Sequence, residues 1–196
     1  MIDLFSINKT TEEQLNDLRI EIQTYQKNLN LEVKKSKIKL FYGNVSNFGS
    51  GVLLIGDPPS SKFFDSPDDK VIINLMTELK IDKYFITYDF LIPNVDINPK
   101  NIKSFSYFVR KLTDIIAPKL IVCFDEHPQF CFFKRKFLIQ DFHGKQIGTH
   151  ENIPIFTTNK ASYYEERSKV ENYVYKEQIK LNDWNAIKKK YEELSK

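Results

Sequence analysis

The sequence of 196 residues is poor in cysteine and glycine, with only two and six of them. The two cysteines, Cys123 and Cys131, exclude a disulfide scaffold and a cysteine-rich metal site, and they suit a reducing compartment. The few glycines form no phosphate-cradling loop, and no nucleophile-elbow motif is present. A signal-peptide pattern is absent, as is any run near the ~20 apolar residues of a membrane helix. We expect a cytoplasmic protein with no membrane partner and no cofactor.

Apolar and aromatic residues are plentiful. They make up 41% and 14% of the chain, including 16 Phe and 10 Tyr, so the chain can bury a full core. The length fits one domain spanning residues 1–196, and we expect a monomer. The net charge is +3, from 29 Lys and Arg against 26 Asp and Glu. That balance permits nucleic-acid binding without requiring it.

Helical and extended patterns alternate along the chain. Thr10, with Glu13 three residues later, predicts the start of a helix over about 10–28, and the tail predicts a helix over about 182–195. Four short apolar runs predict strands, at 52–55, 84–90, 120–124 and 153–157. Helical patterns at 71–79 and 102–116 separate the first three runs. The expected fold is a single-domain three-layer α/β/α sandwich with a central four-stranded parallel sheet.

Ligands bind outside the carboxyl ends of the strands in such sheets. After the first run, the segment from Gly56 to Pro59 predicts a rigid loop able to hold the Asp57 carboxylate or a water. A plain strand-to-helix turn is the other interpretation. Phe64, in the Phe63-Phe64 pair that follows, suits either stacking on a base or anchoring to the core.

The segment 130–137 reads FCFFKRKF. Its cations Lys134, Arg135 and Lys136 suit either a phosphate backbone or the exposed face of an amphipathic element. The three histidines, His127, His143 and His150, have no metal-ligand spacing, so we expect surface or structurally satisfied side chains and no metal site.

Several short motifs occur in an order that resembles a known family. They are Phe41-Tyr42-Gly43, Gly56-Asp57-Pro58-Pro59-Ser60, Phe64, Thr87-Tyr88, Asn98-Pro99, Pro118-Lys119-Leu120-Ile121-Val122, His143-Gly144-Lys145 and Thr158-Asn159-Lys160-Ala161-Ser162-Tyr163. Together they resemble the uracil-DNA glycosylase superfamily, with a pattern closest to its iron–sulfur type, family 4. The resemblance covers most of the chain, from the first helix to Tyr164.

The resemblance departs from the family at the cluster and at the active site. Tyr25, Asn28, Ile92 and Phe105 stand where the family has its four cluster cysteines, so we expect no iron–sulfur cluster. Tyr88 replaces the Asn that reads uracil. Lys160 replaces the His that stabilises the leaving base, which a lysine ammonium is also able to do. Asp57 replaces a Glu and keeps its carboxylate.

The resemblance implies roles for these positions and DNA, duplex or single-stranded, as the partner. Asp57 and Lys160 are the catalytic candidates. The substrate-binding candidates are Gly56, Pro59, Ser60, Phe64 and Tyr88. The DNA-binding candidates are Lys134, Arg135, Lys136, Ser162, Tyr163 and Tyr164.

Two functions stay open at this point. One is hydrolysis of the N-glycosidic bond of uracil or another damaged base in base-excision repair, which requires the base to be extracted from the stack. The other is a catalytically inactive member of the fold that binds DNA or a protein. A flavodoxin-like phosphate site is disfavoured because Pro58 and Pro59 lack backbone N–H groups.

Overall fold

A computed structural model describes residues 9–29, 38–56, 67–89, 99–160, 163 and 170–196. Its centre is a six-stranded sheet in the order β1-β3-β2-β4-β6-β5. The four inner strands are parallel: β3 (Tyr84–Tyr88), β2 (Val52–Gly56), β4 (Leu120–Phe124) and β6 (Ile153–Thr158). These are the four strands expected from the apolar runs, so the mixed α/β class with a mostly parallel sheet is confirmed.

The expected count of four strands is wrong, because an antiparallel strand lies at each edge. β1 (Tyr42–Gly43) pairs with β3, and β5 (Lys145–His150) pairs with β6. Neither has a recognisable pattern in the sequence. β1 has only two residues, and β5 reads KQIGTH, with side chains that are exposed or half-buried. An edge strand without a buried face leaves no apolar run to detect.

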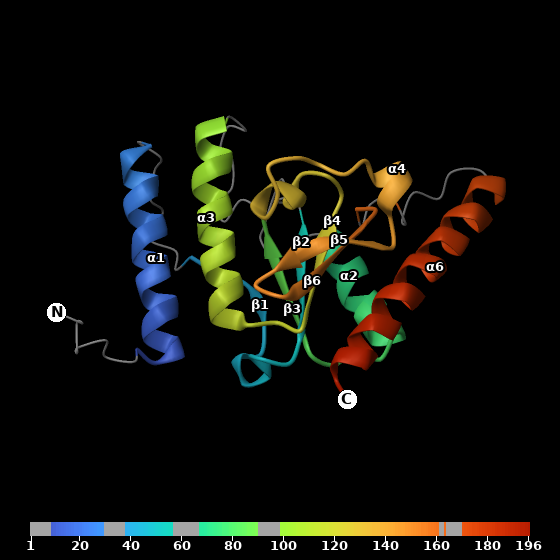
Figure 1. Cartoon of the computed structure of the whole chain (residues 1–196), viewed down its shortest axis with the longest axis horizontal. Coiled ribbons are helices and arrows are strands. Elements are labelled where there is room, and N and C mark those ends of the chain that lie inside the picture. The colour runs from blue at the N-terminus through green and yellow to red at the C-terminus, as the bar shows by residue number, and fades with distance from the viewer. Residues whose placement is uncertain (1–8, 30–37, 57–66, 90–98, 161–162, 164–169) are drawn as a thin grey trace.

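Two helices cover one face of the sheet, α1 (Thr11–Asn28) and α3 (Pro99–Ile116), as Figure 1 shows. The predicted start of α1 is confirmed. Thr10 Oγ1 accepts a hydrogen bond from the Glu13 N–H at 3.3 Å, and the Thr10 N–H donates to Glu13 Oε2 at 2.6 Å. This reciprocal cap satisfies two N–H groups that a helix start otherwise leaves unpaired. The helix then buries Leu15, Leu18 and Ile22.

The opposite face carries α2 (Pro67–Glu78) and α6 (Val170–Leu194), which completes three layers (Figure 1). The C-terminal helix begins at Val170, not near residue 182 as expected. A polar pair such as Asn182-Asp183 is typical of a helix start. Here Asn182 lies inside the helix and accepts a hydrogen bond from Gln178 Nε2 at 3.0 Å, while the Asp183 side chain is buried.

The elements that follow β2 and β4 along the chain pack on opposite faces of the sheet. α2 follows β2 and packs on one face, whereas the short 3-10 helix η2 (Pro128–Cys131) follows β4 and buries Cys131 in the core of the other face. Because β2 and β4 are neighbours, their carboxyl ends form the switch point where ligands bind in open parallel sheets. In the described ranges, no helix is long and apolar enough to cross a membrane.

Candidate functional site

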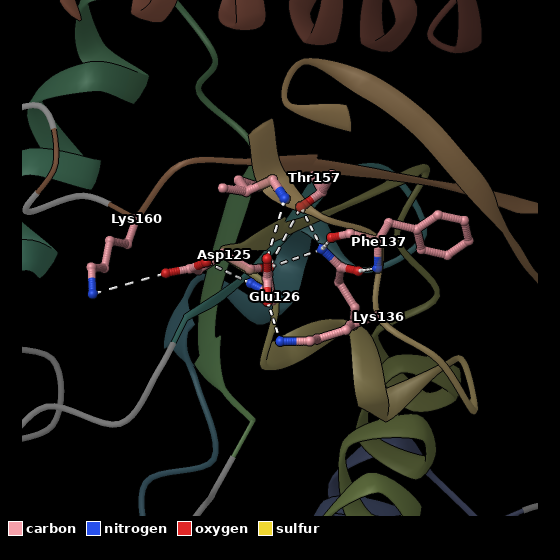
Figure 2. Close-up of polar contacts among 8 residues, drawn as sticks. Asp125, Glu126, Lys136, Phe137, Thr157 and Lys160 are labelled. Carbon is pink, nitrogen blue, oxygen red and sulfur yellow. Dashed lines mark hydrogen bonds and ion pairs between the residues drawn. The ribbon is translucent and has the colours of Figure 1, made fainter. Parts of the chain in front are cut away.

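An acidic turn follows β4 at the switch point. Asp125 has a positive φ of 72°, and its N–H donates to the Thr158 carbonyl at 2.8 Å, which ties the turn to the end of β6. Its Oδ1 accepts the Glu126 N–H at 2.8 Å. The other oxygen, Oδ2, lies 3.9 Å from the Nζ of Lys160 (Figure 2). The turn therefore aims one carboxylate oxygen at the lysine that the resemblance singles out.

Glu126, the next residue of this turn, contacts the segment 130–137, which is called the basic segment below. Glu126 Oε2 lies 2.6 Å from Lys136 Nζ, and Glu126 Oε1 accepts the Ile139 N–H at 3.4 Å (Figure 2). The hydrogen bond from Lys136 lowers the pKa of the Glu126 carboxyl below its ordinary value. Lys160 and Lys136, which come from separate predicted segments, thus pair with consecutive residues of one turn.

A buried amide fixes the end of the basic segment. Gln129 is fully buried, and its Oε1 accepts the Phe137 N–H at 2.6 Å. Its Nε2 lies 3.1 Å from the Phe137 carbonyl, 3.2 Å from the Asp125 carbonyl and 3.0 Å from Thr157 Oγ1. The Gln129 side chain therefore links the acidic turn, the basic segment and β6 to one another by hydrogen bonds.

A cavity of about 420 Å³ opens at the same edge. This volume lies in the range of small-molecule sites, roughly 300–1,000 Å³. The lining combines a carboxylate, an ammonium, an imidazole, two amides and a phenol with two aliphatic side chains: Asp125, Lys160, His143, Gln140, Asn159, Tyr163, Ile139 and Ile179. Such a lining suits a polar ligand with both hydrogen-bond donors and acceptors.

A histidine and a buried acid meet beside this cavity, although 40 residues separate them in the sequence. His143 Nδ1 lies 2.7 Å from Asp183 Oδ1. Asp183, on α6, is only 2% exposed, and its Oδ2 accepts the hydroxyl of Thr158 at 2.9 Å. We expected His143 to be a surface or satisfied residue. It is satisfied on one ring nitrogen, and it also lines the cavity.

Two of the expected substrate-binding residues are the last residues of neighbouring strands. Gly56 ends β2 and pairs in register with Tyr88 at the end of β3. Tyr88 is 3% exposed, and its hydroxyl donates to Asp69 at 2.5 Å. Asp69 is 1% exposed and lies on α2. The Tyr88 hydroxyl is therefore engaged inside the protein.

The other described candidates lie near the cavity or in the basic segment. The Tyr163 N–H donates to the Lys160 carbonyl at 3.0 Å, so the two residues share one turn. Lys134, Arg135 and Lys136 are exposed, and the Arg135 guanidinium lies 4.7 Å from the centre of the Phe137 ring. The remaining candidates fall outside the described residues: Asp57, Pro59, Ser60, Phe64, Ser162 and Tyr164.

The positions that stand for cluster cysteines can be placed in part. The rings of Tyr25 and Phe105 meet edge to face, with centroids 5.7 Å apart. The Tyr25 hydroxyl donates to Asn101 Oδ1 at 2.9 Å. Asn28 and Tyr25 line one groove between α1 and α3, and Ile92 falls outside the described residues. In the described part of the chain, no three His, Cys, Asp or Glu side chains gather to hold a metal.

Sequence reasoning missed Asp125, Glu126 and His143 as site residues. A signal existed for Asp125 and Glu126, because both directly follow a buried strand whose carboxyl end faces the switch point. No such signal existed for His143, because its partner Asp183 lies on the C-terminal helix, for which the sequence indicated only a polar face. A scan of family models found none that matches this chain, and a search of curated proteins found no relative.

Proposed function

We propose that this protein is a DNA glycosylase-like hydrolase that accepts an extruded base at the carboxyl ends of β4 and β6 and cleaves its N-glycosidic bond. The observation that carries the proposal is the approach of the Asp125 carboxylate to the Lys160 ammonium at 3.9 Å on the cavity wall. At this separation the two groups are not hydrogen-bonded, and both side chains are partly exposed, so each can turn toward a ligand.

The chemistry needs opposite charges at two ends of the breaking bond. As the bond breaks, positive charge develops on the sugar and negative charge on the departing base. A carboxylate beside the sugar and an ammonium beside the base stabilise this separation of charge. Lys160 keeps the role that the resemblance implies. Asp125 adds a carboxylate to the one expected at Asp57.

Two features of the fold support the uracil-DNA glycosylase-like identity. Four parallel strands lie between two helical layers, as the resemblance implies. Tyr25 and Phe105, which stand where that family has two ligands of one cluster, are in contact at 5.7 Å. The Tyr25 ring lies equally close to Phe108, at 5.7 Å, so this contact reflects the packing of α1 on α3 and agrees with the resemblance without being specific to it.

The basic segment supplies the contact to DNA in this proposal. Lys134 and Arg135 are exposed, and the next residue, Lys136, is hydrogen-bonded to Glu126 of the acidic turn. Cations in such a place neutralise backbone phosphates and release counterions, which makes DNA affinity depend on salt. Duplex or single-stranded DNA and a cytoplasmic location both belong to this proposal.

One observation favours the alternative, a catalytically inactive DNA-binding module. The Tyr88 hydroxyl donates to the buried Asp69 carboxylate, and the side chain is 3% exposed. The position where the family reads the edge of uracil therefore offers no amide and no unengaged hydroxyl to a base. A strict preference for uracil is not part of the proposal.

A base-release assay separates the two functions. Oligonucleotides, duplex and single-stranded, carry uracil, hypoxanthine, xanthine, hydroxymethyluracil or mismatched thymine, and alkaline cleavage reveals abasic sites. We expect release of one of these bases, lowered about tenfold or more by Lys160→Ala or Asp57→Asn. Lys188→Ala is the matched control, because Lys188 pairs with Glu192 on α6 at 3.7 Å and does not line the cavity.

DNA affinity at several salt concentrations completes the test. We expect Lys134→Ala and Arg135→Ala each to weaken binding and to reduce the salt slope by about one. Base release that is unchanged by both site variants would remove the site assignment. Salt-dependent binding without base release would favour the inactive module, and the absence of DNA binding would contradict both functions.

A further inference from the structure

The contact between His143 and Asp183 is built into the fold. Asp183 comes from α6, His143 follows the short helix α4 (Ile139–Phe142), and Thr158 ends β6. Oδ1 of the buried Asp183 carboxylate lies 2.7 Å from His143 Nδ1, and Oδ2 accepts a hydrogen bond from the Thr158 hydroxyl at 2.9 Å. Three elements that are distant in the sequence thus converge on one carboxylate that is 2% exposed.

Gly144 makes this approach possible. Its φ is +69°, and a Cβ at this position would lie 2.6 Å from Asp183 Oδ1 and 2.8 Å from Asp183 Cα. The Gly144 N–H donates to the Thr157 carbonyl at 2.8 Å, which fixes the turn against β6. The backbone at the histidine is therefore shaped to receive the acid, and no other residue type has room there.

The carboxylate determines which ring nitrogen is open to a ligand. A carboxylate only accepts hydrogen bonds, so the Nδ1 that faces it carries the proton. Nε2 is then left with a lone pair, and it makes no hydrogen bond to any residue that the structure describes. His143 is one-third exposed on its side chain and lines the cavity that also contains Lys160. This is the arrangement of a histidine held ready as a base.

We propose that His143, oriented by Asp183, is the general base of the cavity, an inference that rests on the proposed hydrolysis. Nε2 takes a proton from the attacking water while the water oxygen bonds to C1′ of the sugar. The C1′–N bond breaks, and its electron pair leaves with the base, whose charge is balanced by the Lys160 ammonium. The proton on Nε2 then passes to the departed base, so one water is consumed per base released.

The competing interpretation is a structural link between α6 and the sheet. The chain contains a matched pair for comparison, His150 and Asp114, which meet at 2.9 Å through Nε2. Asp114 is 56% exposed on its side chain, and neither residue lines the cavity. A structural role predicts that breaking either pair alters stability alone. A general base predicts loss of rate at His143 only.

The test measures single-turnover rates of base release on the same oligonucleotide panel with the full chain. We expect His143→Gln to lower the rate about 100-fold or more, while DNA affinity stays within about twofold. Asp183→Asn keeps the size of the side chain but lets the ring adopt the other tautomer, and we expect a similar loss. His150→Gln and Asp114→Asn should keep the wild-type rate.

A second readout does not depend on activity. Nitrogen-15 spectra of the histidine rings should show a proton on Nδ1 and none on Nε2 for His143 in the wild type, with this preference lost in Asp183→Asn. A proton on Nε2 in the wild type would overturn the inference, even if Asp183→Asn fails to fold.

The two proposals fail in different ways. Base release by the wild type, together with a rate for His143→Gln within about threefold of it, would overturn the role of the dyad and leave the glycosylase function intact. Absence of base release by the wild type across the panel would overturn both.

Discussion

A Cβ at position 144 would lie 2.6 Å from Oδ1 of Asp183, so the glycine and the buried acid fit only as a pair. The same carboxylate oxygen lies 2.7 Å from His143 Nδ1. The packing of α6 on the sheet and the orientation of His143 therefore depend on the absence of a side chain at position 144.

The first prediction compares two glycines. Gly49 has a φ of +77°, and a Cβ added there would meet nothing within 4 Å, whereas Gly144 has a φ of +69° and no room. We expect Gly49→Ala to cost about 1–2 kcal/mol of backbone strain. Gly144→Ala should cost about 1–3 kcal/mol more, because the methyl group overpacks against Asp183. Urea unfolding measures both, and equal losses would contradict the close contact.

The second prediction concerns the amide that joins the site segments. Gln129→Ala removes the hydrogen-bond partner of the Phe137 N–H, while the Thr157 hydroxyl keeps its hydrogen bond to the Cys123 carbonyl at 3.3 Å. One unsatisfied group costs about 1–3 kcal/mol, so we expect a loss of at least about 1 kcal/mol in the free energy of unfolding. Gln178→Ala, on the exposed surface of α6, is the control and should change stability by less than about 0.5 kcal/mol.

The third prediction concerns pH. The Lys136 hydrogen bond makes the pKa of Glu126 lower in the folded state than in the unfolded state. Its stabilising contribution is therefore complete above the ordinary carboxyl pKa of 4.5 and is lost as the pH falls through the lower folded value. We expect Glu126→Gln to lose up to about 1 kcal/mol at pH 7 and to converge with the wild type at acid pH. A constant difference across pH would contradict the pair.

The fourth prediction concerns the two thiols. Burial raises the pKa of both Cys123 and Cys131, and both side chains are inside the core. A thiol that stays protonated is a poor nucleophile. We expect neither cysteine to react with iodoacetamide at pH 8 in the native protein, and both to react in urea. Rapid alkylation of either in the folded state would show that the core near β4 opens.

The inner layers of the fold could be predicted because their signals are local. Each inner strand is a short apolar run that is buried on both faces, and the Thr10–Glu13 cap lies within one turn of helix. The edge strand β5 escaped prediction because its pairing with β6 is carried by backbone hydrogen bonds and not by an apolar face. The start of α6 was misplaced because Asp183, a residue typical of caps, serves a tertiary contact instead.

The candidate site also combines residues that local sequence features indicate with contacts that only the fold determines. The basic segment could be selected from its residue types, and Lys160 only through the resemblance, because it stands at the His position of a family motif. Their connection through Asp125 and Glu126 depends on how the strand ends are ordered in the sheet. The pairing of His143 with Asp183 depends in addition on the docking of α6, which no local pattern specifies. Long-range contacts of this kind are properties of the packed chain.

The most direct measurement is detection of the free base by mass spectrometry after the wild-type protein is mixed with the oligonucleotide panel. The account predicts that one damaged or mismatched base appears in solution and that Lys160→Ala reduces its amount about tenfold or more while Lys188→Ala does not. If no base is released from any duplex or single strand under conditions where DNA is bound, the hydrolase assignment is contradicted.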